Sequence, residues 1–348
     1  MGASLRRLKS SVIFSGMAAC AGLVWLAAAS NPALAQSAQA PIKVGFFPTI
    51  AHIAPFYVTE GRGYFAAEKL AVEPVQFARA NEALPALITG EVDVLFGVSV
   101  GGTLYNAIGA RPGSVKLVAA LLTVVPEDLI GTYVRADLAQ SGAVKSPADL
   151  KGRTITLPQR GGAPEYALHV ALKTAGLTVK DVKLQTLPSY DEIEQAFRSG
   201  SIELGVLGEP FATRAREAKI AVPLAPYGKY VNGEQLTFVA YGKRLLSDKD
   251  LGQRFLRAVE KGIADYEAAR QKGSNRAEVI KFIQQGLKGT SAEVIDRAPW
   301  YYLQKDGVIN KEAVANQAAY FAEQGFINKL LPVDEVVDTT FVDALRKK

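Results

Sequence analysis

The sequence predicts an α/β protein with two lobes, each a sheet flanked by helices. Strand-like apolar runs alternate with helical patterns, which is typical of a parallel sheet covered by helices on both faces. The pattern restarts near Ser146, and a helix–strand unit of the first half has a counterpart in the second. The length of 348 residues also exceeds what one hydrophobic core usually supports.

The composition, with 49% hydrophobic and 21% charged residues, is that of an ordinary folded protein. It excludes disordered, collagen-like and disulfide-stapled chains. The formal net charge is +6, but Arg6, Arg7 and Lys9 lie in a leader without acids, and without them the charge falls to +3. The rest of the chain has no extended Lys/Arg run, so we expect no nucleic-acid partner.

Residues 1–35 are expected to be an export signal, cleaved after about Ala35. The basic residues precede an apolar run over 12–29, and Ala33-Leu34-Ala35 provides a small-x-small cleavage site. A membrane anchor is the alternative, although no other stretch reaches the roughly 20 apolar residues of a membrane-spanning helix. Met17-Ala18-Ala19-Cys20 loosely matches a lipidation motif, so lipidation of Cys20 stays open.

Cleavage after Ala35 leaves a mature chain without Cys or Met, because Met1, Met17 and Cys20 all lie in the leader. This excludes thiolate nucleophiles and cysteine-ligated metals. It also fits an oxidising compartment without structural disulfides. The expected location is therefore a bacterial periplasm.

The first half is expected to contain four strands and a capped helix. Apolar, β-prone runs predict the strands, and the spacing of Leu84, Leu87 and Ile88 predicts a helix between Asn81 and Gly90. The predicted strands cover residues 42–47, 72–77, 92–96 and 115–121.

The second half repeats this alternation. Ser146-Pro147-Ala148-Asp149 predicts a helix start, because it combines a cap, a first-turn proline and an acid, and a strand follows at 154–157. Ser189-Tyr190-Asp191-Glu192 is a capping box that opens a helix ending at Gly200. The unit over 86–97 resembles that over 196–208, which favours two similar lobes, although any two helix–strand units share such features.

The last hundred residues are expected to be mainly helical. One helix follows a cap at Ser247, and another covers about 277–285. The apolar stripe of the first consists of Leu251, Phe255, Val259, Ile263 and Tyr266.

Few residues support catalysis. His52 and His169 are the two histidines, and no nucleophile elbow, metal-binding spacing, phosphate loop or dinucleotide motif accompanies them. His169 has apolar neighbours and is expected to pack rather than react. The sequence therefore predicts neither an enzyme nor a cofactor or metal site.

Ligand binding is predicted instead at four loops that leave a strand and enter a helix, because such loops line sites at the carboxyl ends of strands. Thr49 and Ser99 can donate hydrogen bonds, and Arg160 can pair with a carboxylate or sulfonate. The alternatives are that the glycines only permit tight turns, that Arg160 is solvated, and that Glu209 caps its own helix rather than holding a ligand donor. The loops are 48–52, 97–103, 158–166 and 208–210.

Aromatic residues in these loops suggest a second feature of the ligand. Phe47, Tyr166 and Phe211 suit a flat ring if they face the cleft. Together with the polar groups they favour a sulfonate or an aromatic carboxylate. Trp300 and Tyr301 are expected to take part in core or lobe packing.

Several segments of the chain match the signatures of one family. Residues 47–55 are similar to its Pro-x-x-x-His-Ala-Pro loop, and residues 61–70 to its Lys-Gly-Tyr-Phe-x-x-Glu-Gly-Leu segment, with further matches at 88–94, 148–153 and Glu209-Pro210. Along essentially the whole mature sequence the chain resembles exported solute-binding proteins of ABC importers, of the nitrate/sulfonate/taurine type. That type also includes relatives that bind pyrimidine vitamin precursors, so the resemblance adds a pyrimidine-like solute to the expected ligands. Ile53, Arg62 and Ala71 depart from the family pattern, and Ile53 leaves the ligand open because it lies beside the cleft.

This resemblance implies a type II periplasmic-binding-protein fold, in which two crossover strands join lobes that close over a solute. Lobe 1 would comprise residues 41–131 and 238–348, and lobe 2 residues 132–237. The implied partners are a small-molecule ligand and an ABC permease with its ATPase, and we expect a monomer. The implied substrate contacts are Phe47, Thr49, His52, Ser99, Val100, Arg160, Gly161, Gly162, Ala163, Tyr166 and Glu209.

Two other functional classes stay open. An exported enzyme could use His52 with Ser99, and a sensor on the same fold could present its ligand to a membrane receptor. The sequence distinguishes neither transport from sensing nor one solute of the family from another.

Overall fold

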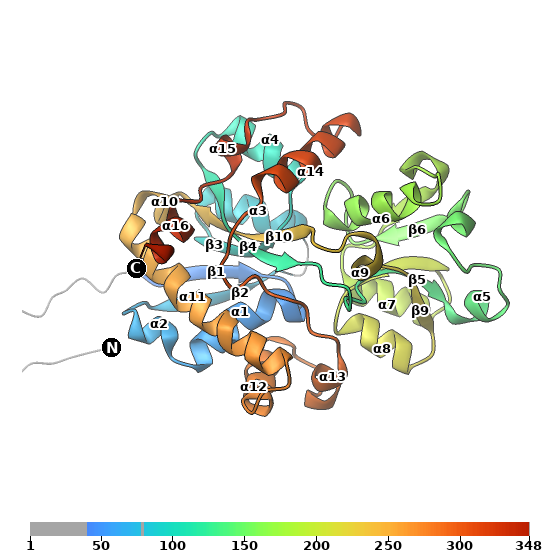
Figure 1. Cartoon of the computed structure of the whole chain (residues 1–348), viewed down its shortest axis with the longest axis horizontal. Helices are drawn as coiled ribbons and strands as arrows, with labels where there is room; N and C mark the ends of the chain where they lie inside the picture. Colours follow the sequence, from blue (N-terminus) through green and yellow to red (C-terminus); the bar gives the residue numbers. More distant parts are fainter. Residues whose placement is uncertain (1–39, 78–79, 348) are drawn as a thin grey trace, which may run out of the picture. The chain divides into compact units, whose positions relative to one another are not determined.

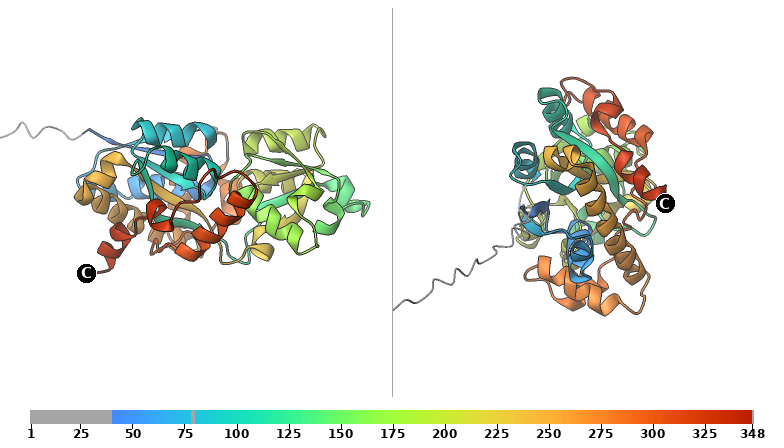
Figure 2. Two further views of the ribbon diagram at one scale, coloured as in Figure 1. Left: turned by 90° about the horizontal axis from the view of Figure 1, so that it is seen from above. Right: turned by 90° about the vertical axis from the view of Figure 1, so that its left-hand side faces the viewer.

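The computed structural model describes residues 40–77 and 80–347, so the predicted export signal and Cys20 lie outside the described residues. The described chain forms two five-stranded mixed sheets flanked by helices, which confirms the predicted two-lobed α/β fold. We call the parts built on these sheets lobe A and lobe B. Lobe A holds most of the start and end of the chain, and lobe B holds its middle (Figures 1 and 2).

The sheet of lobe A contains β1 (Ile42–Phe46), β2 (Val72–Gln76), β3 (Val94–Val98), β4 (Val115–Thr123) and β10 (Gln235–Gly242). Its strand order is β2-β1-β3-β10-β4. β1 is parallel to β2 and β3, whereas β10 is antiparallel to β3 and β4. The four strands predicted in the first half are confirmed as β1 to β4, with small shifts at their ends.

The sheet of lobe B contains β5 (Gly131–Arg135), β6 (Thr154–Leu157), β7 (Lys183–Thr186), β8 (Leu204–Leu207) and β9 (Ala221–Pro226). Its strand order is β7-β6-β8-β5-β9, and β6 has the predicted bounds. β6 is parallel to β7 and β8, whereas β5 is antiparallel to β8 and β9.

The expectation of a purely parallel sheet is therefore wrong for both lobes. β5 carries the chain from lobe A into lobe B and β10 carries it back, and each enters its new sheet against the direction of its neighbours. β5 begins at Gly131 and β10 at Gln235, close to the lobe limits predicted from the resemblance. The limits themselves stay predictions.

The helices of lobe A come from both ends of the chain. α1 packs against α11 and α12, and α16 packs on β4, so the helical end covers the sheet that the start of the chain begins. The predicted stripe of α11 is buried, but the cap is Asp248 rather than Ser247, because the Asp248 side chain accepts from the Leu251 N–H. These helices are α1 (Ile50–Gly61), α2 (Tyr64–Ala67), α3 (Ala80–Thr89), α4 (Gly102–Ala110), α10 (Lys243–Ser247), α11 (Lys249–Arg270), α12 (Arg276–Gly286), α13 (Ala292–Arg297), α14 (Lys311–Glu323), α15 (Val333–Val336) and α16 (Thr340–Arg346).

The helices of lobe B follow the predicted signals. Ser189 caps α7 as predicted, and the apolar residues Ile193, Ala196 and Phe197 of that helix are buried. Ser146 also acts as a cap, but the element that it opens is one 3-10 turn, Pro147–Leu150. The helices are α5 (Ala136–Gln140), α6 (Ala163–Lys173), α7 (Tyr190–Arg198), α8 (Phe211–Glu217) and α9 (Tyr227–Tyr230), with a second 3-10 turn at Val179–Asp181.

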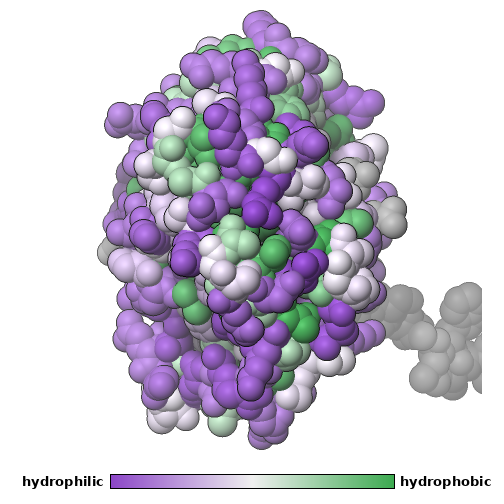
Figure 3. All heavy atoms as spheres, turned by 90° about the vertical axis from the view of Figure 1, so that its right-hand side faces the viewer, coloured by the Kyte–Doolittle hydropathy of each residue, from purple (hydrophilic) through white to green (hydrophobic). Residues whose placement is uncertain are grey.

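The surface offers little exposed apolar area. Figure 3 shows one face, on which hydrophilic residues predominate and apolar ones are scattered. Within residues 40–77 and 80–347, Leu330 is the large hydrophobic residue that is substantially exposed. None of the helices in these ranges is long and apolar enough to cross a membrane.

Candidate functional site

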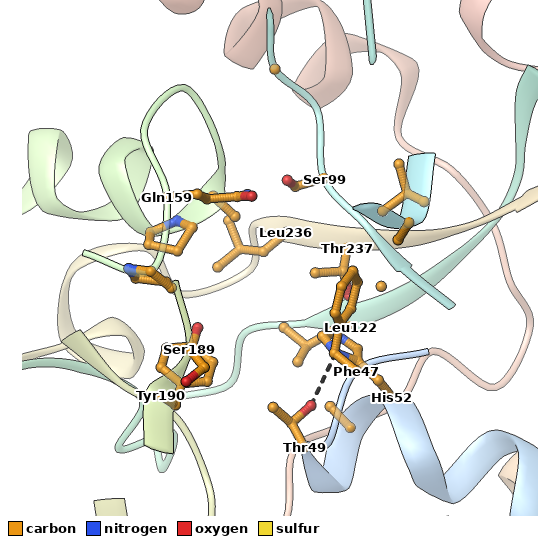
Figure 4. A pocket seen from close by; sticks show the side chains of 18 of the residues that line it. Phe47, Thr49, His52, Ser99, Leu122, Gln159, Ser189, Tyr190, Leu236 and Thr237 are labelled. Carbon is orange, nitrogen blue, oxygen red and sulfur yellow. Dashed lines mark hydrogen bonds between the residues drawn. The ribbon is translucent and has the colours of Figure 1, made fainter. Parts of the chain in front are cut away.

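A cavity of about 550 Å³ lies where loops at the carboxyl ends of strands from both sheets meet (Figure 4). Three of the four predicted loops line it, and the fourth is followed directly by Phe211, which also lines it. The crossover strand β10 completes the wall. The lining includes Phe47, Thr49, His52, Leu84, Ser99, Leu122, Gln159, Arg160, Ser189, Tyr190, Phe211, Tyr227, Leu236, Thr237 and Tyr301.

The structure brings together most of the predicted contact residues. Those that line the cavity are Phe47, Thr49, His52, Ser99, Arg160, Gly161 and Ala163. Val100 is instead fully buried in the core, and Gly162 is the N-cap residue of α6. Tyr166 and Glu209 also lie outside the lining, for reasons given below. Ligand contact itself stays a prediction for all of these residues.

His52 and Phe47 form the wall on the side of lobe A. The His52 Nδ1 lies 3.0 Å from the Thr49 Oγ1, and its ring meets that of Phe47 edge-on at 5.7 Å. Burial lowers the pKa of His52 to about 4, so the ring is neutral at physiological pH. The His52 ring also lies against Gly97. A Cβ at position 97 would come within 2.6 Å of His52 Nε2, and Gly97 has a φ of +94°. This position therefore requires glycine.

Arg160 does not offer a free guanidinium to the cavity, as the sequence suggested it could. Its Nε and Nη2 donate to the Glu165 carboxylate at 2.8 and 2.9 Å, and the Gly161 N–H donates to the same carboxylate at 2.8 Å. Glu165 is fully buried in the first turn of α6. The partner of Arg160 is thus a residue of its own loop, which raises the pKa of the guanidinium.

Glu209 lies outside the cavity because its carboxylate turns back onto its own helix. It accepts from the Thr213 N–H at 2.9 Å and from Arg216 Nη1 at 3.1 Å, so the capping interpretation holds. The backbone N–H of Glu209 donates to the Tyr301 hydroxyl. This bond ties the loop of lobe B to the C-terminal part of the chain.

Tyr166 packs against aromatic residues of the protein and lies outside the cavity lining. Its ring lies 5.7 Å from that of Tyr320 and 6.4 Å from that of Phe321, both on α14. His169, on the same helix as Tyr166, stacks on Tyr320 at 4.2 Å and so has the expected packing role. The helix that covers α6 belongs to lobe A and is remote in sequence, so no local pattern indicated this contact.

Several lining residues were missed from the sequence. Tyr190 opens α7 within the predicted capping box, and its ring lies 6.4 Å from that of Phe211. Tyr301 was expected to take part in packing, yet it lines the cavity, while its neighbour Trp300 stacks on Tyr266. Thr237 is the last residue of the predicted lobe 2, and this predicted limit was the one signal that could have placed it at the lobe boundary.

Charge is scarce in this lining. Among the described lining residues, Arg160 is the sole Lys or Arg and Asp191 the sole acid. The remaining side chains are apolar, aromatic, amide or hydroxyl groups. No cluster of three or more His, Cys, Asp or Glu side chains that could hold a metal ion occurs in the part of the chain that the structure describes.

Comparison with known sequences gives one family and two relatives. The family described as NMT1/THI5 like matches residues 50–272. The riboflavin-binding protein RibY of Chloroflexus aurantiacus is 27% identical over 248 residues, which cover 69% of this chain and 67% of RibY. The putative binding protein YtlA of Bacillus subtilis is 24% identical over 330 residues, covering 92% of this chain and 94% of YtlA.

Solved structures share the fold at low sequence identity. The periplasmic nitrate-binding protein NrtA of Synechocystis PCC 6803 has a TM-score of 0.71 at 13% identity, covering 88% of this chain and 87% of that one. The periplasmic aliphatic sulphonate binding protein SsuA of Escherichia coli has a TM-score of 0.67 at 19% identity, covering 85% and 97%. The desulfurization enzyme DSZB has a TM-score of 0.61 at 16% identity, covering 88% and 99%. The same fold thus carries both binding proteins and an enzyme.

Proposed function

We propose that this chain is a solute-binding protein of an ABC importer, because it belongs to the NMT1/THI5-like family. It captures a small organic solute between lobe A and lobe B and delivers it to a permease with its ATPase. The observation that carries this proposal is the cavity of about 550 Å³ lined by loops of both lobes. That volume falls within the range of small-molecule sites, roughly 300–1,000 Å³.

Capture works through contacts that both lobes share. A ligand that touches Phe47 in lobe A and Tyr190 in lobe B binds the closed arrangement better than an open one, and so shifts the population toward closure. The crossover strands β5 and β10 act as the hinge. At Gly101 the backbones of the two lobes meet closely, since a Cβ there would lie 2.0 Å from the Gly161 carbonyl oxygen.

The named relatives support binding and export. RibY, NrtA and SsuA are described as binding proteins, and the last two as periplasmic. By the same reasoning we propose that this chain acts in the periplasm. Cleavage near Ala35 and a monomeric state stay predictions from the sequence. Figure 3 agrees with a solvated surface on the face that it draws.

The site is better suited to binding than to catalysis. Residues 36–348 contain no cysteine, which leaves no thiolate nucleophile. His52 has a pKa lowered to about 4 by burial, so it is a weak general base at neutral pH. We therefore propose that the protein is not an enzyme, although the neighbour DSZB shares its fold.

The proposal is tested by a thermal-unfolding screen after unfolding and refolding have removed any carried ligand. The panel contains alkyl sulfonates, taurine, nitrate, aromatic carboxylates, pyrimidines and riboflavin, each at about 1 mM. A solute with a Kd near 1 μM adds about 4 kcal/mol to the free energy of unfolding and raises Tm by several degrees. Mass spectrometry of the recovered solute then separates a binder from an enzyme. A chemically altered solute would contradict the proposal.

A further inference from the structure

We propose that the solute is an uncharged, planar aromatic compound with polar edges rather than an anion, an inference that rests on the proposed function. Three features of the cavity carry it. The cationic group is already neutralised by the chain itself, aromatic rings stand on both lobes, and buried hydroxyls in the lining have no partner among the described residues.

The positions where lobe B would hold an anion are filled by its own carboxylates. Glu165 occupies the first turn of α6, where it accepts from the Arg160 guanidinium and the Gly161 N–H. Glu209 plays the same part at α8 by accepting from Thr213 and Arg216. A helix N-terminus or an arginine attracts an anionic ligand only while no carboxylate of the protein itself is already bound to it. An anionic ligand would therefore meet a guanidinium whose charge Glu165 already compensates and, at Asp191, a negative charge.

Aromatic rings suit the remaining space to a flat ligand. Phe47 and His52 meet edge-on in lobe A, and Tyr190 lies beside Phe211 in lobe B. Figure 4 shows Phe47 and Tyr190 on opposite sides of the cavity. A planar ring between them would contact aromatic side chains of both lobes. His52 is neutral and adds no charge for an anion.

Two buried hydroxyls indicate where the polar edges of the ligand lie. Tyr227 is 3% exposed and the Thr237 Oγ1 is buried, and neither hydroxyl has a hydrogen-bond partner within the described ranges. Both residues line the cavity. Buried polar groups are nearly always paired, so an unpaired hydroxyl in a ligand cavity marks a position for a ligand atom or a water that the ligand displaces.

The test measures affinity for matched neutral and anionic rings by calorimetric titration of the purified protein. The pairs are benzamide with benzoate, 2-naphthamide with 2-naphthoate, and riboflavin with riboflavin 5′-phosphate. We expect the neutral member to bind at least about tenfold more tightly in every pair that binds. Equal or tighter binding of the anionic members overturns the inference, and so does the absence of binding in all three pairs.

Variants locate the preference in the named residues. E165Q leaves the Arg160 charge unpaired and should raise affinity for the anionic members about tenfold, whereas the double variant R160Q/E165Q should not. Tyr227→Phe should weaken binding of the neutral member about tenfold. Tyr320→Phe is its matched control, because the Tyr320 hydroxyl also lacks a partner among the described residues but lies outside the cavity lining, and it should leave affinity unchanged. Equal effects of the two Phe variants would overturn the assignment of Tyr227.

The panel of the preceding section separates the two proposals. If nitrate or an alkyl sulfonate binds and is recovered unchanged, the protein is a solute-binding protein and only the inferred ligand class fails. If a ring compound is bound but converted to a product, the proposed function fails while the predicted ligand class stands.

Discussion

Lobe A and lobe B repeat one helix–strand–helix unit, but the two copies differ where the second helix begins. α3, β3 and α4 follow one another in lobe A, as α7, β8 and α8 do in lobe B. At the end of β3 the chain passes through Gly97 and leaves the strand at Ser99, and the first turn of α4 has no acid. Beyond β8 it passes through Gly208 to Glu209, whose carboxylate is fully buried and paired with Arg216.

The two units share a backbone arrangement but differ in the charge of the side chains that follow their strands. Near the starts of α6 and α8, lobe B pairs Arg160 with Glu165 and Arg216 with Glu209. Lobe A presents a hydroxyl at Ser99 and a neutral ring at His52 instead. Lobe B therefore holds these two loops with internal charge pairs, whereas the cavity loops of lobe A, 48–52 and 97–103, contain no Lys, Arg, Asp or Glu.

The largest expected effect is on stability, at the start of α8. Glu209→Ala removes the acceptor of the Thr213 N–H and of Arg216, and should lower the free energy of unfolding by about 3 kcal/mol. Ser99→Ala, at the corresponding place in lobe A, should change it by no more than about 0.5 kcal/mol. Urea unfolding measures both, and similar losses would show that the lobes do not differ in this way.

The two histidines provide the next test, because His52 lies in lobe A and His169 in lobe B. His52 has a pKa near 4 in the folded protein and an ordinary pKa near 6.5, so the unfolded chain takes up the proton first. Protonation of His52 in the unfolded chain therefore lowers the free energy of unfolding by about 2 kcal/mol as pH falls from 7 to 5.

The variants His52→Gln and His169→Gln measure these contributions in urea unfolding at several pH values. His52→Gln should remove about 2 kcal/mol of the pH dependence over that interval. His169→Gln should remove less, because His169 is only half-buried. A variant at position 52 with the pH profile of the wild type would contradict the assigned pKa.

A smaller difference is expected between the two glycines that leave the equivalent strands. Gly97→Ala places a Cβ 2.6 Å from His52 at a φ of +94°, whereas Gly208→Ala meets Tyr190 at 3.1 Å without a positive φ. Gly97→Ala should therefore cost about 1.5 kcal/mol more than Gly208→Ala in thermal or urea unfolding. Reversal of that order would mean that His52 moves freely away from Gly97.

The smallest expected effect is on binding. Because His52 stays neutral above its pKa of about 4, affinity for a neutral ring compound should change by less than about twofold between pH 5.5 and 8. Titration calorimetry across that range measures it. A steep loss of affinity toward pH 6 would require a protonating group in the cavity and would contradict the neutral site.

Much of the fold could be predicted because its signals are local. The caps at Ser146 and Ser189, the strand over 154–157 and the buried stripe of α11 all follow from residues within a few positions of one another. The antiparallel entry of β5 and β10 could not be predicted from alternation alone, since strand direction depends on which sheet the chain joins.

Apolar periodicity and capping act over short stretches of chain, so the sequence alone predicts a two-lobed α/β fold, several of its strands and capped helices, and the loops that approach the cavity. Which side chains remain available to a ligand depends instead on contacts between distant segments. Arg160 pairs with Glu165, Tyr166 packs under α14, and Tyr301 reaches the cavity from the C-terminal part of the chain. A polar or aromatic group binds the partner that lies nearest in space, and folding brings most of those partners together from distant positions in the sequence.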